Sequence, residues 1–130
     1  MFMKYLIKLE DRITGREALI ECHAGMLLEE LSIKIKVELQ LPYSDFGVHC
    51  FRGRGYYYVT DDIDIRSLEG LVGDWDESHE KVRMPNRRFR RSTERVRLKY
   101  AFTVKGSALS YSQITDKGCD RVRCTLIERY

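Results

Sequence analysis

The sequence contains no long hydrophobic run. Its uninterrupted apolar stretches are only a few residues long, whereas a membrane-spanning helix needs about 20 apolar residues in succession. The N-terminus also lacks a basic start followed by an apolar segment, the pattern of a secretory signal. We therefore expect a cytoplasmic protein that makes no contact with a membrane.

Familiar catalytic and metal-binding patterns are missing as well. No glycine-rich phosphate loop or G-x-S-x-G nucleophile motif accompanies the three histidines. The four cysteines form no C-x-x-C pair, and in Cys22-His23 and His49-Cys50 the neighbouring side chains would point to opposite faces of a strand. We therefore predict a protein without enzymatic activity, cofactor or metal, whose cysteines are buried free thiols.

The net charge of +3 is small, but it conceals two adjacent blocks of opposite sign. Residues 61–80 carry eight acidic side chains and one basic side chain, a net charge of −7. Residues 81–99 carry nine basic side chains and one acidic side chain, a net charge of +8. Such blocks either neutralise each other or present separate charged faces to partners.

Length and patterning indicate a single α+β domain over residues 1–130. Residues 3–10 and 16–23 alternate between apolar and polar side chains around a turn that ends in Gly15, which predicts an antiparallel hairpin. Further strands are predicted over residues 46–51, 56–60, 109–114 and 122–127. With a helix after the hairpin, the sum is a ββαββ (β-grasp-like) core with further antiparallel strands at the C-terminal end.

In two segments, apolar and polar residues alternate in the pattern typical of a strand. Residues 26–41 alternate as a strand would, but Leu27, Leu31, Ile35 and Leu39 also recur every four residues. Sixteen residues are long for a strand and ordinary for a helix, so we predict a helix stopped by Pro42. Residues 96–104 also alternate, and there we predict a strand with one face made of Val96, Leu98, Tyr100, Phe102 and Val104.

A long charged loop is predicted over about residues 73–95, which show no periodicity. Within it, the sequence Arg-Arg-Phe-Arg-Arg at residues 87–91 places four guanidinium groups around one aromatic ring. Guanidinium groups can neutralise phosphates while the ring stacks on a base. The residues predicted to contact nucleic acid are Arg83, Arg87, Arg88, Phe89, Arg90, Arg91 and Arg95.

The layout and the helix resemble the plasmid pRiA4b ORF-3-like family. That family opens with a strand pair and then a helix bearing a T-L-x-x-L-H-x-x-I pattern, whose apolar positions are occupied here by Leu28, Leu31 and Ile35. Leu27 stands at the threonine and Ser32 at the histidine of that pattern, and residues 100–107 keep only the aromatics and the glycine of a later strand that runs into D-F-G-D. The resemblance implies an α+β fold and no enzymatic activity; a ubiquitin-like β-grasp shares the same opening.

Two functional hypotheses follow. The first is a small non-enzymatic binding or adaptor domain that contacts nucleic acid through the Arg-rich loop. The alternative is a β-grasp-type protein–protein interaction module that has an acidic protein partner, or whose acidic and basic blocks pair within or between chains. Whether residues 61–80 cover residues 81–99 separates the two, and the sequence sets no oligomeric state.

Overall fold

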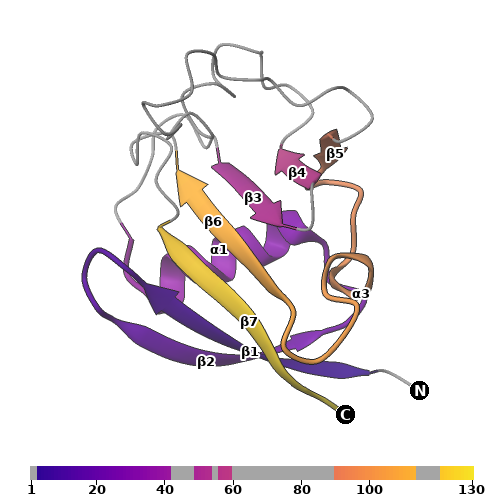
Figure 1. Cartoon of the computed structure of the whole chain (residues 1–130), viewed down its shortest axis with the longest axis horizontal. Coiled ribbons are helices and arrows are strands. Elements are labelled where there is room, and N and C mark those ends of the chain that lie inside the picture. Colours follow the sequence, from indigo (N-terminus) through magenta and orange to yellow (C-terminus); the bar gives the residue numbers. More distant parts are fainter. Residues whose placement is uncertain (1–2, 42–48, 54–55, 60–89, 114–120) are drawn as a thin grey trace.

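A computed structural model of the chain describes residues 3–41, 49–53, 56–59, 90–113 and 121–130. In these residues one sheet and two helices form a mixed α+β fold (Figure 1). The elements follow in the order β1 (Lys4–Asp11), β2 (Glu17–His23), α1 (Leu28–Glu38), β3 (His49–Gly53), β4 (Tyr56–Val59), β5 (Arg90–Ser92), α3 (Leu98–Ala101), β6 (Ala108–Gln113) and β7 (Val122–Arg129). The predicted α+β class and the ββαββ order at the start of the chain are confirmed.

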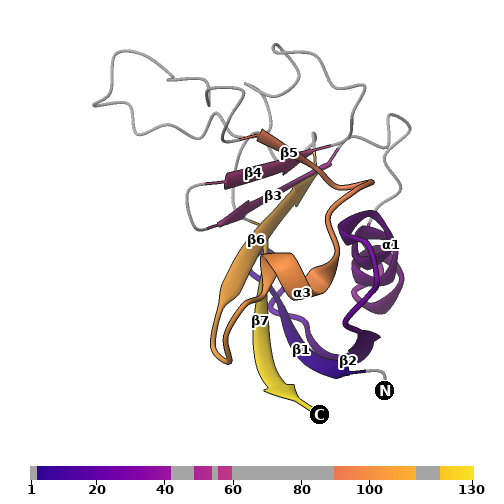
Figure 2. The same cartoon turned by 90° about the vertical axis from the view of Figure 1, so that its right-hand side faces the viewer.

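The strands lie in the order β2-β1-β7-β6-β3-β4-β5 across the sheet. Neighbouring strands are antiparallel except β4 and β5, which are parallel. The two C-terminal strands, β6 and β7, therefore separate the β1–β2 hairpin from the β3–β4 hairpin. The sheet twists strongly, so that β3, β4 and β5 cross the direction of β7 (Figure 2).

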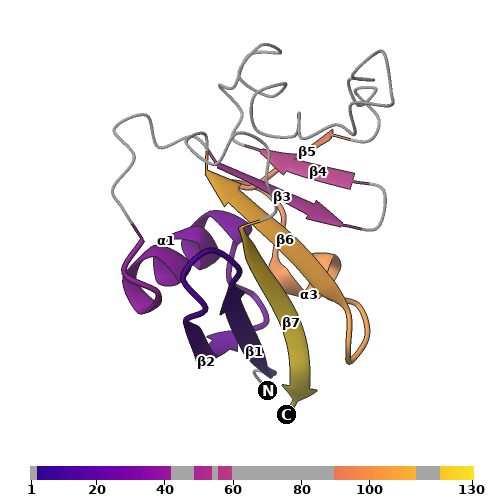
Figure 3. The same cartoon turned by 60° about the vertical axis from the view of Figure 1, so that its left-hand side comes forward.

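Both helices lie against the same face of the sheet (Figures 2 and 3). The helix α1 buries Leu31 and Ile35 completely, whereas Ile33 and Val37 are 56% and 68% exposed. A strand would have placed all four side chains on one face. The spacing of every four residues, and not the alternation of apolar and polar residues, therefore describes this segment correctly. The predicted helix is confirmed.

Each end of α1 is fixed by main-chain hydrogen bonds. At its start, the amides of Leu28 and Glu29 donate to the carbonyls of Val96 and Thr93, at 3.0 and 2.9 Å. At its end, Leu41 N donates to Lys36 O at 3.0 Å and Gln40 N to Val37 O at 3.3 Å, with Gln40 at a φ of 52°. This is a Schellman arrangement in which glutamine occupies the left-handed position that glycine usually takes.

The strand predicted over residues 96–104 is wrong, because residues 98–101 form α3. Leu98, Ala101 and Phe102 are buried, while Tyr100 and Val104 are 66% and 57% exposed. A helical turn brings side chains three and four positions apart to one face, so it buries these three together. The alternation of apolar and polar residues predicted that Tyr100 and Val104 are buried, but both side chains are exposed.

Part of the predicted charged loop also differs from expectation. Residues 90–92 form β5, which pairs in parallel with β4. A strand of three residues carries no period of its own, and its pairing partner is distant in sequence. Residues 73–89 of the predicted loop lie outside the described residues, as does the start of the strand predicted over residues 46–51. Whether residues 61–80 cover residues 81–99 therefore stays a question, because residues 60–89 are not described.

Candidate nucleic-acid interface

The structure describes the C-terminal part of the predicted nucleic-acid site. Arg90 and Arg91 lie in β5, which is an edge strand of the sheet. Arg95 is exposed in the turn that follows β5. The other four predicted residues lie outside the described part of the chain: Arg83, Arg87, Arg88 and Phe89. We call residues 90–99 the basic segment, because they carry five basic side chains and one acidic side chain.

The turn after β5 fixes the basic segment to α1. Ser92 accepts the amide of Glu94 on its hydroxyl at 3.1 Å and the amide of Val96 on its carbonyl at 3.0 Å. The Thr93 side chain is fully buried, and its hydroxyl donates to Glu29 Oε2 at 2.8 Å. A hydrogen bond to an ionised acceptor is stronger than a neutral one, so this contact ties the turn to the first turn of α1.

An antiparallel bridge between Leu27 and Arg97 joins the segments that lead into the two helices. Its hydrogen bonds are reciprocal: Leu28 N donates to Val96 O at 3.0 Å, and Leu98 N donates to Met26 O at 2.8 Å. On both sides of the bridge the chain follows the same course of strand, turn, bridge residue and helix. Each helix therefore receives its first main-chain partner from the segment that leads into the other.

Among the cations of the basic segment whose burial the structure describes, the exposed ones are Arg95, Arg97 and Lys99. The Arg97 guanidinium is oriented by a hydrogen bond from its Nη1 to Gly25 O at 2.6 Å. Lys99 lies next to Tyr100, with its Nζ 5.2 Å from the ring centroid, a distance at which a cation is attracted to an aromatic ring. Exposed cations on a fixed backbone can neutralise phosphates, and an exposed ring beside them can stack on a base.

Three exposed basic or aromatic residues in or next to the basic segment were absent from the residues predicted to contact nucleic acid: Arg97, Lys99 and Tyr100. Of these, Tyr100 is the aromatic one. The alternation of residues 96–104 assigned it to a buried face, whereas α3 turns it 66% toward solvent. Leu98, Ala101 and Phe102 have the spacing of one helical turn, but a single turn is too short to establish a helical period in the sequence.

A buried ion pair between Asp11 and Arg121 joins the β1–β2 turn to the residue before β7. Asp11 and Arg121 are 2% and 7% exposed, with 3.4 Å between Asp11 Oδ2 and Arg121 Nη2. Burial alone would raise the pKa of Asp11, but hydrogen bonds from Ile13 N, the Thr14 hydroxyl and Arg121 together lower it below its usual value. The partners of the carboxylate come from its own turn and from Arg121, the residue before β7, so the pair stabilises the junction of these elements.

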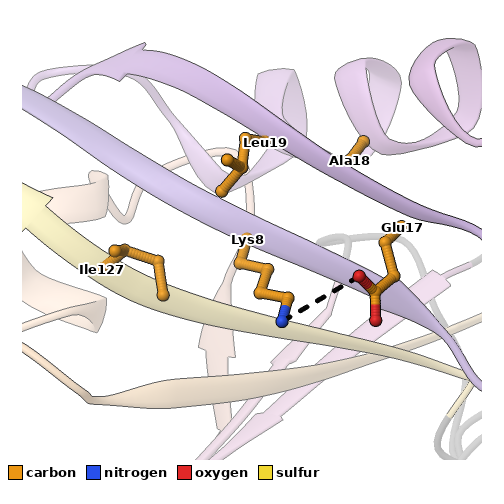
Figure 4. Close-up of a pocket in the computed structure, with 5 residues that line it drawn as sticks. All are labelled: Lys8, Glu17, Ala18, Leu19 and Ile127. Carbon is orange, nitrogen blue, oxygen red and sulfur yellow. Dashed lines mark ion pairs between the residues drawn. The ribbon is translucent and has the colours of Figure 1, made fainter.

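A hollow of about 490 Å³ lies over β1, β2 and β7 (Figure 4). It is lined by Lys8, Glu17, Ala18, Leu19 and Ile127. The Lys8 ammonium and the Glu17 carboxylate approach to 4.0 Å, and both side chains are partly exposed. The lining combines aliphatic surface with one weak ion pair.

Three of the four cysteines are buried thiols that take part in no disulfide, as predicted: Cys22, Cys50 and Cys124. The fourth, Cys119, lies outside the described residues. Burial raises the pKa of the Cys22 thiol to about 11 and also raises that of Cys124, so both are protonated and unreactive at neutral pH. Within the ranges that the structure covers, no group of three or more His, Cys, Asp or Glu side chains could hold a metal ion.

The described helices include none with the length and apolar character needed to cross a membrane. Comparisons with protein families, with curated proteins and with solved structures found no match.

Proposed function

We propose that this chain is a non-enzymatic, cytoplasmic binding domain that contacts nucleic acid through residues 81–99. The observation that carries the proposal is the exposure of Arg95, Arg97 and Lys99 on a short stretch that is fixed to the fold. Nucleic acid is the partner class that a dense row of cations fits best, because its backbone carries a regular row of phosphates.

The anchoring of the basic segment supports this function over a solvated tail. Its backbone is paired with β4 on one side and bridged to Leu27 on the other. Because these contacts already restrict the backbone, binding a polyanion would order fewer dihedral angles than it would in a flexible chain. The hydrogen bond of Arg97 to Gly25 O uses one of the five N–H donors of a guanidinium group.

The second candidate is a β-grasp-type protein–protein interaction module. Its support is the ββαββ chain order, which also fits the resemblance to the pRiA4b ORF-3-like family, and the exposed edge strand β2 with Leu19 at 63% exposure. Extended peptides can add to such an edge. However, Lys34 of α1 donates from its Nζ to Glu21 O at 3.3 Å, so this carbonyl of β2 already has a partner within the chain. Nucleic-acid binding therefore remains the first proposal.

Binding to labelled oligonucleotides at about 50 mM salt, followed by fluorescence anisotropy, tests the proposal. The double variant Arg95→Ala/Lys99→Ala should bind roughly 10- to 100-fold more weakly than the wild type, because each lost phosphate contact weakens low-salt affinity severalfold. The matched control is Arg12→Ala/Arg123→Ala, which removes two exposed cations elsewhere and should leave affinity nearly unchanged. The β1–β2 turn, which carries Arg12, lies on the opposite side of Figure 1 from α3.

Two results would overturn the proposal. One is the absence of binding by the wild type to both single-stranded and duplex oligonucleotides at low salt. The other is an equal loss of affinity in the two double variants, which would mean that only the overall charge matters. Retention of one specific protein by the immobilised domain, with no nucleic-acid affinity, would favour the β-grasp-type module.

A further inference from the structure

Tyr100 lies on a rigid support. The one-turn helix α3 is closed by a hydrogen bond from Phe102 N to Leu98 O at 2.8 Å, and Lys99 N donates to Ala24 O at 3.1 Å. Leu98 and Ala101 are 0% and 1% exposed and hold the other side of α3 in the core. The ring is therefore presented to solvent by a backbone that cannot easily turn it inward.

The surroundings of Tyr100 differ from those of Tyr130, another exposed tyrosine. Tyr130 is 57% exposed, but its hydroxyl donates to the carboxylate of Glu21. Tyr100 directly follows Lys99, whose ammonium lies near its ring, and Arg97 stands three positions earlier in the chain. One exposed ring thus lies beside a carboxylate, and the other beside an ammonium group that can contact a phosphate.

The geometry points to Tyr100 as a base-stacking residue, and hence to single-stranded nucleic acid as the ligand of the basic segment. This inference rests on the proposed function and names its ligand class. In a duplex the faces of the bases are covered by their neighbours, whereas an unpaired base offers its face to an aromatic side chain. Arg97 and Lys99 are close enough in the chain for their side chains to contact the phosphates next to a stacked base.

The size of α3 also favours a single strand over a duplex. Reading a duplex commonly requires a helix that lies in the major groove, which is about 12 Å wide. Four residues of helix span only about 6 Å, at about 1.5 Å per residue. Such a short turn can present one ring but cannot extend along a groove.

Substitutions at Tyr100 in the full chain test the inference by anisotropy with a single-stranded oligonucleotide of 12 mixed bases and with its duplex. The wild type should prefer the single strand. Tyr100→Leu, which keeps an apolar side chain but removes the ring, should weaken single-strand binding roughly 5- to 100-fold, as expected for the loss of one stacked base. Tyr100→Phe keeps the ring and should remain within about twofold of the wild type.

The control is Tyr130→Leu, which removes an exposed ring outside the basic segment and should leave the affinity within about twofold. Equal binding of Tyr100→Leu and wild type, or equal wild-type affinity for duplex and single strand, would overturn the inference while leaving the proposed function intact. The absence of all nucleic-acid binding by the wild type would overturn the proposed function itself. Because Tyr100 is exposed, the far-UV circular dichroism of its variants should match that of the wild type.

Discussion

The two segments that meet at the Leu27–Arg97 bridge both consist of a strand, a turn, a bridge residue and a helix, but their helices differ in length and in exposure. On one side, β2 leads into α1, a helix of 11 residues that covers the sheet. On the other side, β5 leads into α3, a helix of only 4 residues. The long helix contributes a stripe of buried side chains to the core, whereas the short one buries little more than Leu98 and Ala101.

The solvent sides of the two helices differ in charge. The helix α1 carries three acidic and two basic residues, a mixture typical of a solvated face. The segment around α3 exposes Arg95, Arg97, Lys99 and Tyr100, with Glu94 as its acidic member. The same sequence of strand, turn, bridge residue and helix therefore precedes both a helix that covers the core and a helical turn with exposed cations and an exposed aromatic ring.

The largest expected effect is on the core side of this comparison. Leu31→Ala removes a fully buried side chain of α1 and should lower the free energy of unfolding by about 2–5 kcal/mol, because a cavity is left in the core. Val37→Ala alters the same helix at a position 68% exposed and should change it by less than about 1 kcal/mol. Urea unfolding of both variants measures the difference, and similar losses would show that α1 is not the core element described.

The connection between the two segments can be broken at Thr93. Thr93→Val keeps the shape of a fully buried side chain but removes the hydroxyl that donates to Glu29, so the free energy of unfolding should fall by about 1.5–3 kcal/mol. Thr103→Val, at an exposed position, should change it by less than about 0.5 kcal/mol. A Thr93→Val protein as stable as the wild type in urea would refute the role of this contact.

The end of α1 provides a change of opposite sign. Gln40 has a positive φ of 52°, so Gln40→Gly should raise the free energy of unfolding by up to about 1 kcal/mol, less the weak hydrogen bond from Arg16 to the glutamine side chain. Glu38→Gly, at the last helical residue, should instead lower it by up to about 1 kcal/mol. Thermal unfolding of the pair distinguishes the two positions, and a loss in both variants would contradict the Schellman end.

The smallest expected effect belongs to the basic segment. Arg95→Ala/Lys99→Ala should change the free energy of unfolding by less than about 0.5 kcal/mol, because both side chains are exposed. Leu98→Ala, between them in sequence, removes a fully buried side chain and should cost about 2–5 kcal/mol. If chemical denaturation showed the double variant to be strongly destabilised, these cations would have a structural role instead of a binding role.

Sequence reasoning succeeded where a pattern repeats often enough to be recognised. The β1–β2 hairpin shows alternation over seven or eight residues per strand, and α1 repeats its fourfold spacing three times from Leu27 to Leu39. It failed at α3 and β5, because four and three residues cannot establish a period and their conformations depend on distant partners. Arg95 was predicted from the sequence, whereas Arg97 and Lys99 entered only the charge count of residues 81–99, and the exposure of Tyr100 depended on the conformation of α3.

The salt dependence of binding tests the central claim most directly. The logarithm of the association constant for a single-stranded oligonucleotide should fall linearly with the logarithm of salt concentration, by about 0.7 for each phosphate neutralised. In Arg95→Ala/Lys99→Ala the slope should be shallower by about 1.4, since two contacts are lost, while Arg12→Ala/Arg123→Ala should retain the wild-type slope. A slope unchanged in the first variant would contradict the account.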